Sequence, residues 1–526
     1  MTRCESGQFG SLLKRAVLGA ALFLCATSVV AQNITLSAKG GGLTISGRFI
    51  GYDGENVQID SQYGPLTLRY ATVDCDGDMC PARENYLPTL RFSGASRMAE
   101  VLLPALVHGF ARSKGLRVLE DQIDETHLTQ TLMDGENAVA KFAFRLTNTD
   151  EGFADLIAHE ADFVMSVREV RDQERRRAAE VGIGQLDDPR QSRIIGIDAL
   201  VPVVPAQSAL TRISLVQLAQ IFAGEIDNWS ALGLDDLPIT PVLGAPTDGA
   251  AQRFVDDVVR AYDADLAKTT LRIPGDQSLA AAVAETIGAI GVVPFTKIGN
   301  TRAIALHDDC GFYTSPRITA LKTEDYPLTA PLFLYMPKRR MMPVAREFLT
   351  WLRRPQAQLV VRRTGFVDQG AVPISLDAQG QRFANAIGAA GEDMPLSELQ
   401  RMVRVLGKHV RLSTSFRFEV GSTRLDAQSR SNLLTLAQAI KDGEYAGRKL
   451  LLVGFSDGRG AAKPNRDLSA ARAEAVLKDI EQVSGGSLPA DVTIEIEAFG
   501  EALPMGCDDT EWGRQMNRRV ELWIAQ

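Results

Sequence analysis

The clearest structural signal in the chain is GFSDGRGAAKPNRDLSAARAEAVLKDI, residues 454–480, which follows the apolar run KLLLV. The apolar run predicts a strand, and LSAARAEAVLKDI has the period of a helix. Asp457 then lies just beyond the strand and Arg472 lies on the helix. The two charges can converge on a zwitterionic ligand, because a carboxylate accepts from an ammonium group and a guanidinium binds a carboxylate bidentately. An ordinary salt bridge within the loop is the alternative.

Three motifs in this region resemble the OmpA-like peptidoglycan-binding domain. They are S-D-x-x-G from Ser456, N-x-x-L-S-x-x-R-A from Asn465 and N-R-R-V-E from Asn517. The resemblance covers residues 411–526 and implies a βαβαββ sandwich. In that family an aspartate and an arginine at these positions grip the diaminopimelate of the peptidoglycan stem peptide. The residues to which the resemblance assigns this binding are Asp457, Arg472, Ser456, Asn465 and Arg518.

The middle of the chain alternates helical segments such as 98–115 with short apolar strands such as 163–167, which predicts an α/β domain with mainly parallel sheets. Its wording, above all IFAGEIDNW at residues 221–229, resembles the phosphate-binding-protein-like solute receptors of ABC transporters. This resemblance covers residues 90–372. It implies a two-lobed periplasmic-binding fold of the type II kind, with the ligand in the cleft between the lobes.

Phosphate receptors hold a dehydrated oxyanion with hydroxyl groups, amides at helix N-termini and usually an arginine. The residues that the resemblance carries onto this chain are Ser93, Ser96, Thr149, Ser166, Arg168 and Asp248. The fourth loop of the family usually reads R-x-x-S-G-T, and here it reads GAPTDGAAQRF, which lacks both the arginine and the triplet. Three carboxylates in these loops, those of Asp150, Glu151 and Asp248, would repel a dianion. The sequence therefore argues against phosphate, and leaves open another small anionic or zwitterionic solute, or a cleft used for protein contact.

Two further segments complete the multidomain α/β organisation. Residues 32–88 contain short alternating runs separated by GGG, DGEN and SQYG, which predict a small β module that contacts another envelope protein or the receptor domain. Residues 373–410 are polar, Gly-rich and compatible with helix, and predict a helical linker.

The first 31 residues read as a cleaved export signal. Lys14 and Arg15 precede an apolar run that ends with Val29 and Ala31 at the small-residue positions of a cleavage site. The run is shorter than the roughly 20 residues that a membrane helix requires. Together with the two resemblances, this predicts a periplasmic protein of a Gram-negative-type cell, associated with the peptidoglycan and the outer membrane.

Four of the six cysteines remain after cleavage, in an oxidising compartment. Cys75 and Cys80 flank the turn sequence DGDM, which favours a local disulfide. A metal site is less favoured, because one cysteine pair supplies only half of a zinc shell and the five histidines form no close pair. Cys310 and Cys507 are distant in sequence, and they can pair with each other, with another molecule or with nothing.

Length and composition agree with a soluble protein of about three domains at roughly 150 residues each. The chain has 526 residues, 45% of them apolar, and a net charge of −8, which is unlike a nucleic-acid-binding protein. GFSDG fits a serine-hydrolase elbow, but the last histidine, His409, precedes Ser456, whereas that fold places it after the serine. With no nucleotide, metal or cofactor motif, we expect a non-enzymatic protein that is anchored to peptidoglycan and presents a solute-binding-like domain. The alternative is a receptor for phosphate or another solute that serves an ABC transporter.

Overall fold

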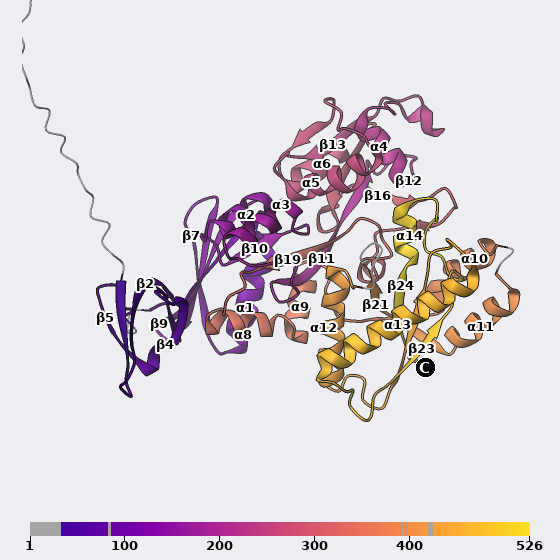
Figure 1. The fold of residues 1–526 in the computed structure, drawn as a ribbon. Helices are drawn as coiled ribbons and strands as arrows, with labels where there is room; N and C mark the ends of the chain where they lie inside the picture. The colour runs from indigo at the N-terminus through magenta and orange to yellow at the C-terminus, as the bar shows by residue number, and fades with distance from the viewer. Residues whose placement is uncertain (1–32, 83–85, 392–393, 419–423) are drawn as a thin grey trace, which may run out of the picture. The chain divides into compact units, whose positions relative to one another are not determined.

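The computed structural model describes residues 33–82, 86–391, 394–418 and 424–526. The expected export signal lies outside these residues. The chain divides into two compact units, residues 1–86 and residues 87–526 (Figure 1). Among the described helices, none combines the length and the apolar character needed to cross a bilayer.

The first unit is a five-stranded antiparallel sheet in the order β4-β3-β2-β1-β5. Its strands are β1 (Asn33–Ala38), β2 (Thr44–Tyr52), β3 (Asn56–Ser61), β4 (Gly64–Arg69) and β5 (Val73–Asp76). Alternating apolar residues bury one face, with Ile34, Val57 and Ile59 at its centre. Cys75 and Cys80 form a disulfide across the turn that follows β5.

Residues 87–372, which we call the receptor part after the family that they resemble, form two lobes joined by two strands, β11 (Ser192–Val204) and β19 (Thr329–Tyr335). The first lobe comprises β6 (Thr89–Ala95), β7 (Arg117–Gln122), β8 (His127–Asp134), β9 (Asn137–Thr147), β10 (Phe163–Ser166), α1 (Leu103–Ser113), α2 (Thr149–Ile157), α3 (Asp172–Glu180), α8 (Pro343–Trp351) and α9 (Pro355–Arg363). The second lobe comprises β12 (Arg212–Ser214), β13 (Thr240–Gly244), β14 (Leu271–Ile273), β15 (Ala289–Pro294), β16 (Arg302–Ala303), β17 (Ala305–His307), β18 (Tyr313–Thr314), α4 (Leu215–Ala223), α5 (Gly249–Phe254), α6 (Asp276–Glu285) and α7 (Ile318–Lys322).

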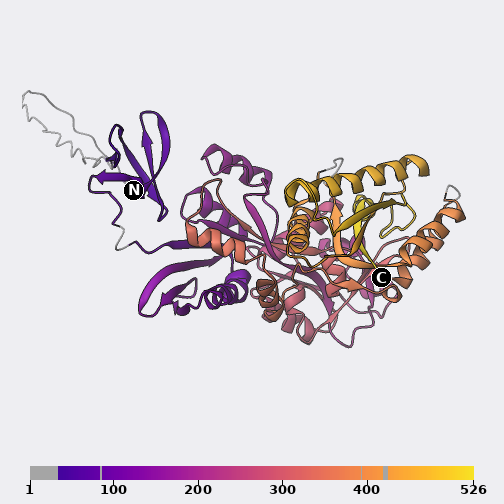
Figure 2. The ribbon, with the colours of Figure 1, turned by 90° about the horizontal axis from the view of Figure 1, so that it is seen from below.

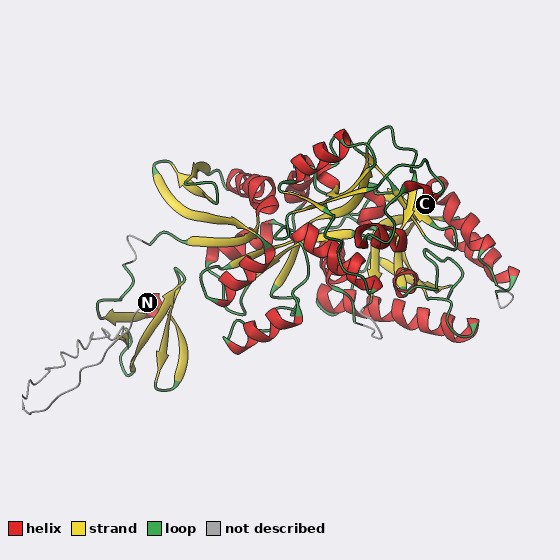
Figure 3. Cartoon of the chain, turned by 90° about the horizontal axis from the view of Figure 1, so that it is seen from above, coloured by secondary structure: helices red, strands yellow, loops and turns green. Residues whose placement is uncertain are grey.

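The receptor sheets are mixed, which corrects the expectation of mainly parallel sheets. Within the lobes β6 pairs in parallel with β9 and β10, and β13 pairs in parallel with β14 and β15. The joining strands run the other way, since β19 is antiparallel to β10 and to β11, and β11 is antiparallel to β15. A strand that returns from one lobe to the other has to cross the sheet in the opposite direction, and periodicity along the sequence does not report strand direction. Helices cover the strands in both lobes (Figure 3).

The C-terminal part is a sheet in the order β20-β21-β24-β22-β23 with helices on both faces. Its elements are β20 (Pro373–Ile374), β21 (His409–Arg417), β22 (Lys449–Phe455), β23 (Thr493–Ala498), β24 (Arg519–Ala525), α10 (Gly380–Gly388), α11 (Leu396–Leu406), α12 (Ala427–Lys441), α13 (Ala462–Ser484) and α14 (Glu511–Asn517). The expected βαβαββ order is present, and the insertion before the last strand adds α14.

The segment expected to be a linker is part of this domain. Alternate residues of β22 face opposite sides, so Leu450 packs against α12 and α13 while Leu451 packs against α10 and α11. Figure 2 shows α13 and the helix pair α10–α11 on opposite sides of the strands. The apolar residues Leu399, Met402 and Leu406 lie on one face of α11 and are buried. Burial of this apolar face explains why α11 covers the sheet rather than staying in solvent.

A buried ionic network joins the receptor part to the C-terminal part. Glu521 on β24 contacts Arg519 at 2.8 Å, Arg411 at 3.3 Å and Arg382 of α10, all with little or no exposure. Arg411 also binds Asp325, which lies just before β19 of the receptor, at 2.7 Å. Burial alone would raise the pKa of Glu521, but the surrounding arginines hold it well below its usual range.

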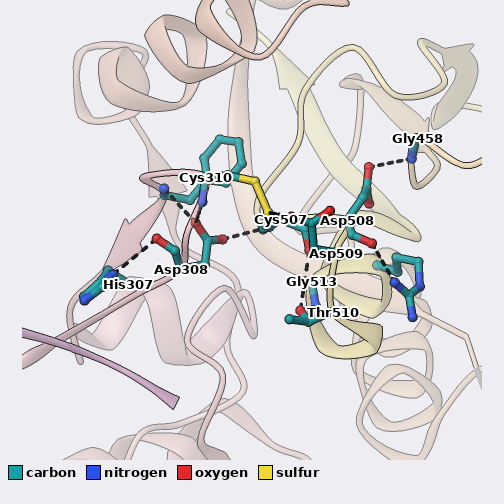
Figure 4. Close-up of a disulfide and its surroundings, with 12 residues drawn as sticks. His307, Asp308, Cys310, Gly458, Cys507, Asp508, Asp509, Thr510 and Gly513 are labelled. Atoms are coloured by element: carbon teal, nitrogen blue, oxygen red, sulfur yellow. Dashed lines mark hydrogen bonds between the residues drawn. A yellow bond between two sulfur atoms is a disulfide. The ribbon is translucent and has the colours of Figure 1, made fainter. Parts of the chain in front are cut away.

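A second disulfide, Cys310–Cys507, links the second lobe to the insertion that carries α14 (Figure 4). Asp308 supports it, since its carboxylate accepts from the backbone amides of Cys507 at 2.7 Å and Cys310 at 3.1 Å. The sequence left this pairing open. Among the described residues, Cys310, Cys507 and Asp509 lie close enough to share a metal ion, but the two sulfurs are bonded to each other.

We predict that Glu521→Gln lowers the free energy of unfolding of the 87–526 unit by about 3–5 kcal/mol, because it leaves buried guanidinium groups without a counter-charge. Because the folded state lowers the pKa of Glu521, the deficit is complete at neutral pH. It shrinks only as the pH falls below roughly 4. Urea unfolding measures it, with Glu474→Gln on the exposed side of α13 as control. Equal stabilities of the two variants would contradict the prediction.

We also predict that replacing Cys310 and Cys507 together by serine costs about 2–5 kcal/mol of stability. The loop that this disulfide closes spans 197 residues, against five for Cys75–Cys80, and a longer loop restricts the unfolded chain more. Peptide mapping without reductant should recover both cross-linked pairs. Free Cys310 and Cys507 thiols in the native protein would show the pairing to be wrong.

Candidate functional site

The C-terminal domain brings Asp457 and Arg472 together through a close helix–strand contact. A methyl group at Gly454, near the end of β22, would lie 2.0 Å from the carbonyl oxygen of Ser469 on α13, so only glycine allows this approach. Asp457 follows β22, and Arg472 lies one turn beyond Ser469. We call the region formed by Ser456, Asp457, Arg472 and Arg518 the loop site.

Arg472 is buried, with 7% of its surface exposed, yet it is poorly satisfied. Among the described residues, its Nε and Nη1 atoms have no hydrogen-bond partner, and the same holds for Oγ of Ser456. Burial, together with repulsion from Arg518, lowers the pKa of Arg472, and Asp457 opposes this shift. A buried guanidinium with open donors costs free energy, which the carboxylate of a ligand would recover.

The remaining residues predicted to bind the stem peptide, Asp457, Arg518 and Asn465, have protein partners. Asp457 pairs with Arg518, whose Nη1 lies 3.0 Å from its Oδ2, rather than with Arg472. Asn465 donates to Glu501 at 2.5 Å. The loop site therefore holds a carboxylate that is shared with one arginine and a second arginine with unused donors.

The disulfide-bearing insertion borders the loop site. Asp508, next to Cys507, accepts from the backbone amide of Gly458 at 2.8 Å and from Asn517 at 2.9 Å. Figure 4 shows the carboxylate of Asp508 accepting from Gly458 on one side of the insertion, and that of Asp308 accepting from Cys507 on the other. The insertion thus connects the second receptor lobe to the residue that follows Asp457.

The receptor part has a cleft of about 560 Å³ between its lobes. Strand ends and helix starts of both lobes form it, as is usual in open α/β sheets. The lining residues that carry charge are Arg97, Glu100, Asp248, Asp276 and Lys297. We call it the interlobe cleft.

Arg97 dominates the interlobe cleft and crosses it. Its Nη1 lies 3.1 Å from Asp198 on β11, and its Nη2 lies 2.9 Å from Asp276, the first residue of α6 in the second lobe. Burial opposes the charge of Arg97, but Asp198, Asp276 and Asp248 together raise its pKa. Burial raises the pKa of Asp276. The charges of Asp248 and Asp198 raise it further, and that of Arg97 lowers it.

Of the six residues predicted to bind a solute, two line the interlobe cleft, Ser96 and Asp248. The Ser96 hydroxyl donates to the carbonyl of Thr147, and Asp248 caps α5 by accepting from Ala250 and Ala251 at 3.2 Å.

The other four do not line this cleft and have contacts elsewhere in the protein, and their role in binding a solute stays a prediction. Ser93 donates to Asp155 at 2.5 Å, and the Ser166 hydroxyl donates to the carbonyl of Arg168. Thr149 is fully buried. Arg168 is enclosed by Asp150 and Glu174. Asp150 is paired with Arg168, and neither Asp150 nor Glu151 lines the interlobe cleft. The carboxylates that line it are those of Glu100, Asp248 and Asp276.

Sequence reasoning missed Arg97 and Asp276. Arg97 directly follows Ser96 in the loop FSGASRM, so the loop was identified while its charged residue was not. Asp276 follows Pro-Gly after a short strand and starts a helix, the same arrangement as in the loops that carry the predicted solute-binding residues. Neither position suggests an ion pair between lobes, because 179 residues of chain separate the partners.

Comparison with known proteins assigns the receptor part and the C-terminal part to two different families. A family model described as a PBP superfamily domain matches residues 87–355, and the OmpA family model matches residues 417–518. The phosphate-binding protein PstS of Bacillus subtilis is 30% identical over 197 residues, which are 37% of this chain and 60% of that protein. The peptidoglycan-associated lipoprotein of Pseudomonas putida is 34% identical over 113 residues, 22% of this chain and 64% of that protein.

The matched stretches span less than two thirds of the length of these two relatives. An ABC-type phosphate transport receptor from Vibrio cholerae aligns with 53% of this chain and 99% of its own, at 18% identity and a TM-score of 0.42, a likeness too weak to inform function. Because the first family model covers half of the 526 residues, the chain belongs to the PBP superfamily, and it carries an OmpA family domain after the receptor part.

Proposed function

We propose that this is a non-enzymatic envelope protein that binds peptidoglycan through its OmpA family domain and holds a solute-binding-type domain at the wall. The observation that carries the proposal is Arg472, a buried guanidinium with two unused donors beside Asp457. The similarity to a peptidoglycan-associated lipoprotein supports it.

The diaminopimelate of a stem peptide suits the loop site chemically. Its free end carries an ammonium and a carboxylate on the same carbon atom. In the proposed mode the carboxylate accepts from the guanidinium of Arg472, and the ammonium donates to Asp457. The unpaired hydroxyl of Ser456 lies in the same region and supplies a further hydrogen bond. Arg518 orients Asp457 without occupying Arg472.

Attachment to the wall determines what the receptor part can do. A transport receptor shuttles to its permease, whereas a protein fixed on peptidoglycan stays where it binds. The proposed role is therefore a scaffold, sensor or local solute store in the periplasm.

A phosphate receptor is the second candidate, favoured by the similarity to the phosphate-binding protein PstS of Bacillus subtilis. The interlobe cleft opposes it. Asp248 and Asp276 face an incoming dianion, and the Nη atoms of Arg97 are already paired.

We predict that Arg472→Ala and Asp457→Ala each weaken the binding of a diaminopimelate muropeptide at least about 30-fold, since each removes one partner of a buried charged contact. Isothermal titration of the full mature protein measures this. Lys478→Ala, an exposed position on the same helix, should bind like the wild type.

A muropeptide with lysine in place of diaminopimelate separates the two contacts, because it keeps the ammonium and lacks the carboxylate. We expect it to bind the wild type weakly and to be insensitive to Arg472→Ala. Equal affinity for both muropeptides would refute the assigned role of Arg472.

For the interlobe cleft, we predict no saturable binding of phosphate by the wild-type protein below about 1 mM, because the facing carboxylates repel the anion. Titration at neutral pH and low salt tests this. Micromolar affinity would favour the transport-receptor candidate.

A further inference from the structure

The interlobe cleft contains an ion pair that joins the lobes without any solute. Arg97 comes from the first lobe, between β6 and α1, and Asp276 comes from the second lobe, at the start of α6. The guanidinium has 11% of its side chain exposed and the carboxylate 19%. Both groups are therefore largely withdrawn from water.

The contact leaves part of the guanidinium unused. Nη1 is taken by Asp198 at 3.1 Å and Nη2 by Asp276 at 2.9 Å, while Nε has no hydrogen-bond partner among the described residues. Nε and Nη2 form one edge of the guanidinium, the edge that binds oxyanions through two parallel hydrogen bonds. Asp276 contacts only one of these two donors.

Other charged groups in and around the interlobe cleft interact with Arg97 and Asp276. Asp248 raises the pKa of Asp276 and that of Arg97, and so lies within electrostatic reach of both. Lys297 opposes the shift of Asp276. Asp198 is fixed from its own side by Thr296, whose hydroxyl donates to it at 3.1 Å, so Asp198 remains a partner of Arg97 whatever happens to Asp276.

We propose that Asp276 is an internal substitute for an anionic ligand and is the residue that makes the interlobe cleft refuse inorganic oxyanions. Its carboxylate, from the opposite lobe, occupies one donor, Nη2, of the oxyanion-binding edge of Arg97. A solute that enters with a negative charge has to displace this carboxylate, which the covalent chain keeps at high local concentration. The inference rests on the receptor part of the proposed function and not on wall binding.

Removal of the Asp276 carboxylate should convert the interlobe cleft into an oxyanion site. It frees the Nε–Nη2 edge of Arg97, takes one negative charge from the cleft, and opens the N-terminus of the ten-residue helix α6. Asp198 then still neutralises and orients the guanidinium.

The test titrates phosphate and, separately, sulfate into wild type, Asp276→Asn and Asp276→Ala by calorimetry. We expect at least about a tenfold gain in affinity for both anions in both variants. Glu285→Gln, at the other end of α6 and exposed, removes the same charge outside the interlobe cleft and should bind like the wild type. The double variant Asp276→Asn with Arg97→Gln should lose the gain.

The outcomes are distinct. A wild type that binds phosphate as tightly as the variants overturns the proposal, and so do variants that bind neither anion. The same samples are titrated with the muropeptide, which reports folding and wall binding independently. If the Asp276 variants bind the muropeptide normally but gain no affinity for the anions, only the role of Asp276 is refuted. If the wild type does not bind the muropeptide, the proposed wall binding is refuted.

Discussion

The buried carboxylate of Glu521 is the constraint on which the arrangement of residues 87–526 depends. It lies among Arg382, Arg411 and Arg519, and Arg411 extends the network to Asp325 of the receptor part. Charges removed from water are stable only with their counter-charges in place, so each contact requires the others. The helices of residues 380–406, the OmpA family domain and the receptor therefore form one structure.

This attachment has consequences for the receptor. Asp325 lies four residues before β19, one of the two strands that join the lobes. The disulfide Cys310–Cys507 attaches the second lobe to the insertion beside the loop site. The OmpA family domain thus contacts the receptor part both near one of the strands that join its lobes and on the second lobe. A domain connected in this way differs from one on a flexible linker, since the receptor part is held against it rather than free to diffuse around it.

Two buried arginines, Arg472 and Arg97, differ in whether carboxylates of the protein already pair with their guanidinium groups. Arg472 has open donors and an adjacent carboxylate that another arginine already holds, an arrangement that lacks a negative partner. Arg97 has carboxylates from two elements and accepts no further charge easily. The first suits a ligand with a carboxylate, and the second suits a cleft that excludes anions. The difference lies in the neighbours supplied by distant parts of the chain.

The sequence alone determined the local units. The motifs around Asp457 and Arg472, the helix–strand alternation and the turn between Cys75 and Cys80 are short-range patterns, and short-range patterns follow from backbone period and turn chemistry. Only the tertiary structure decided that strands β11 and β19 are antiparallel to their neighbours. It also decided that Arg168 forms ion pairs with Asp150 and Glu174. It also decided the pairings Arg97–Asp276, Arg411–Asp325 and Cys310–Cys507. Their partners lie from 86 to 197 residues apart, and the free energy of such contacts depends on burial and on neighbouring charges, which exist only once the chain has folded.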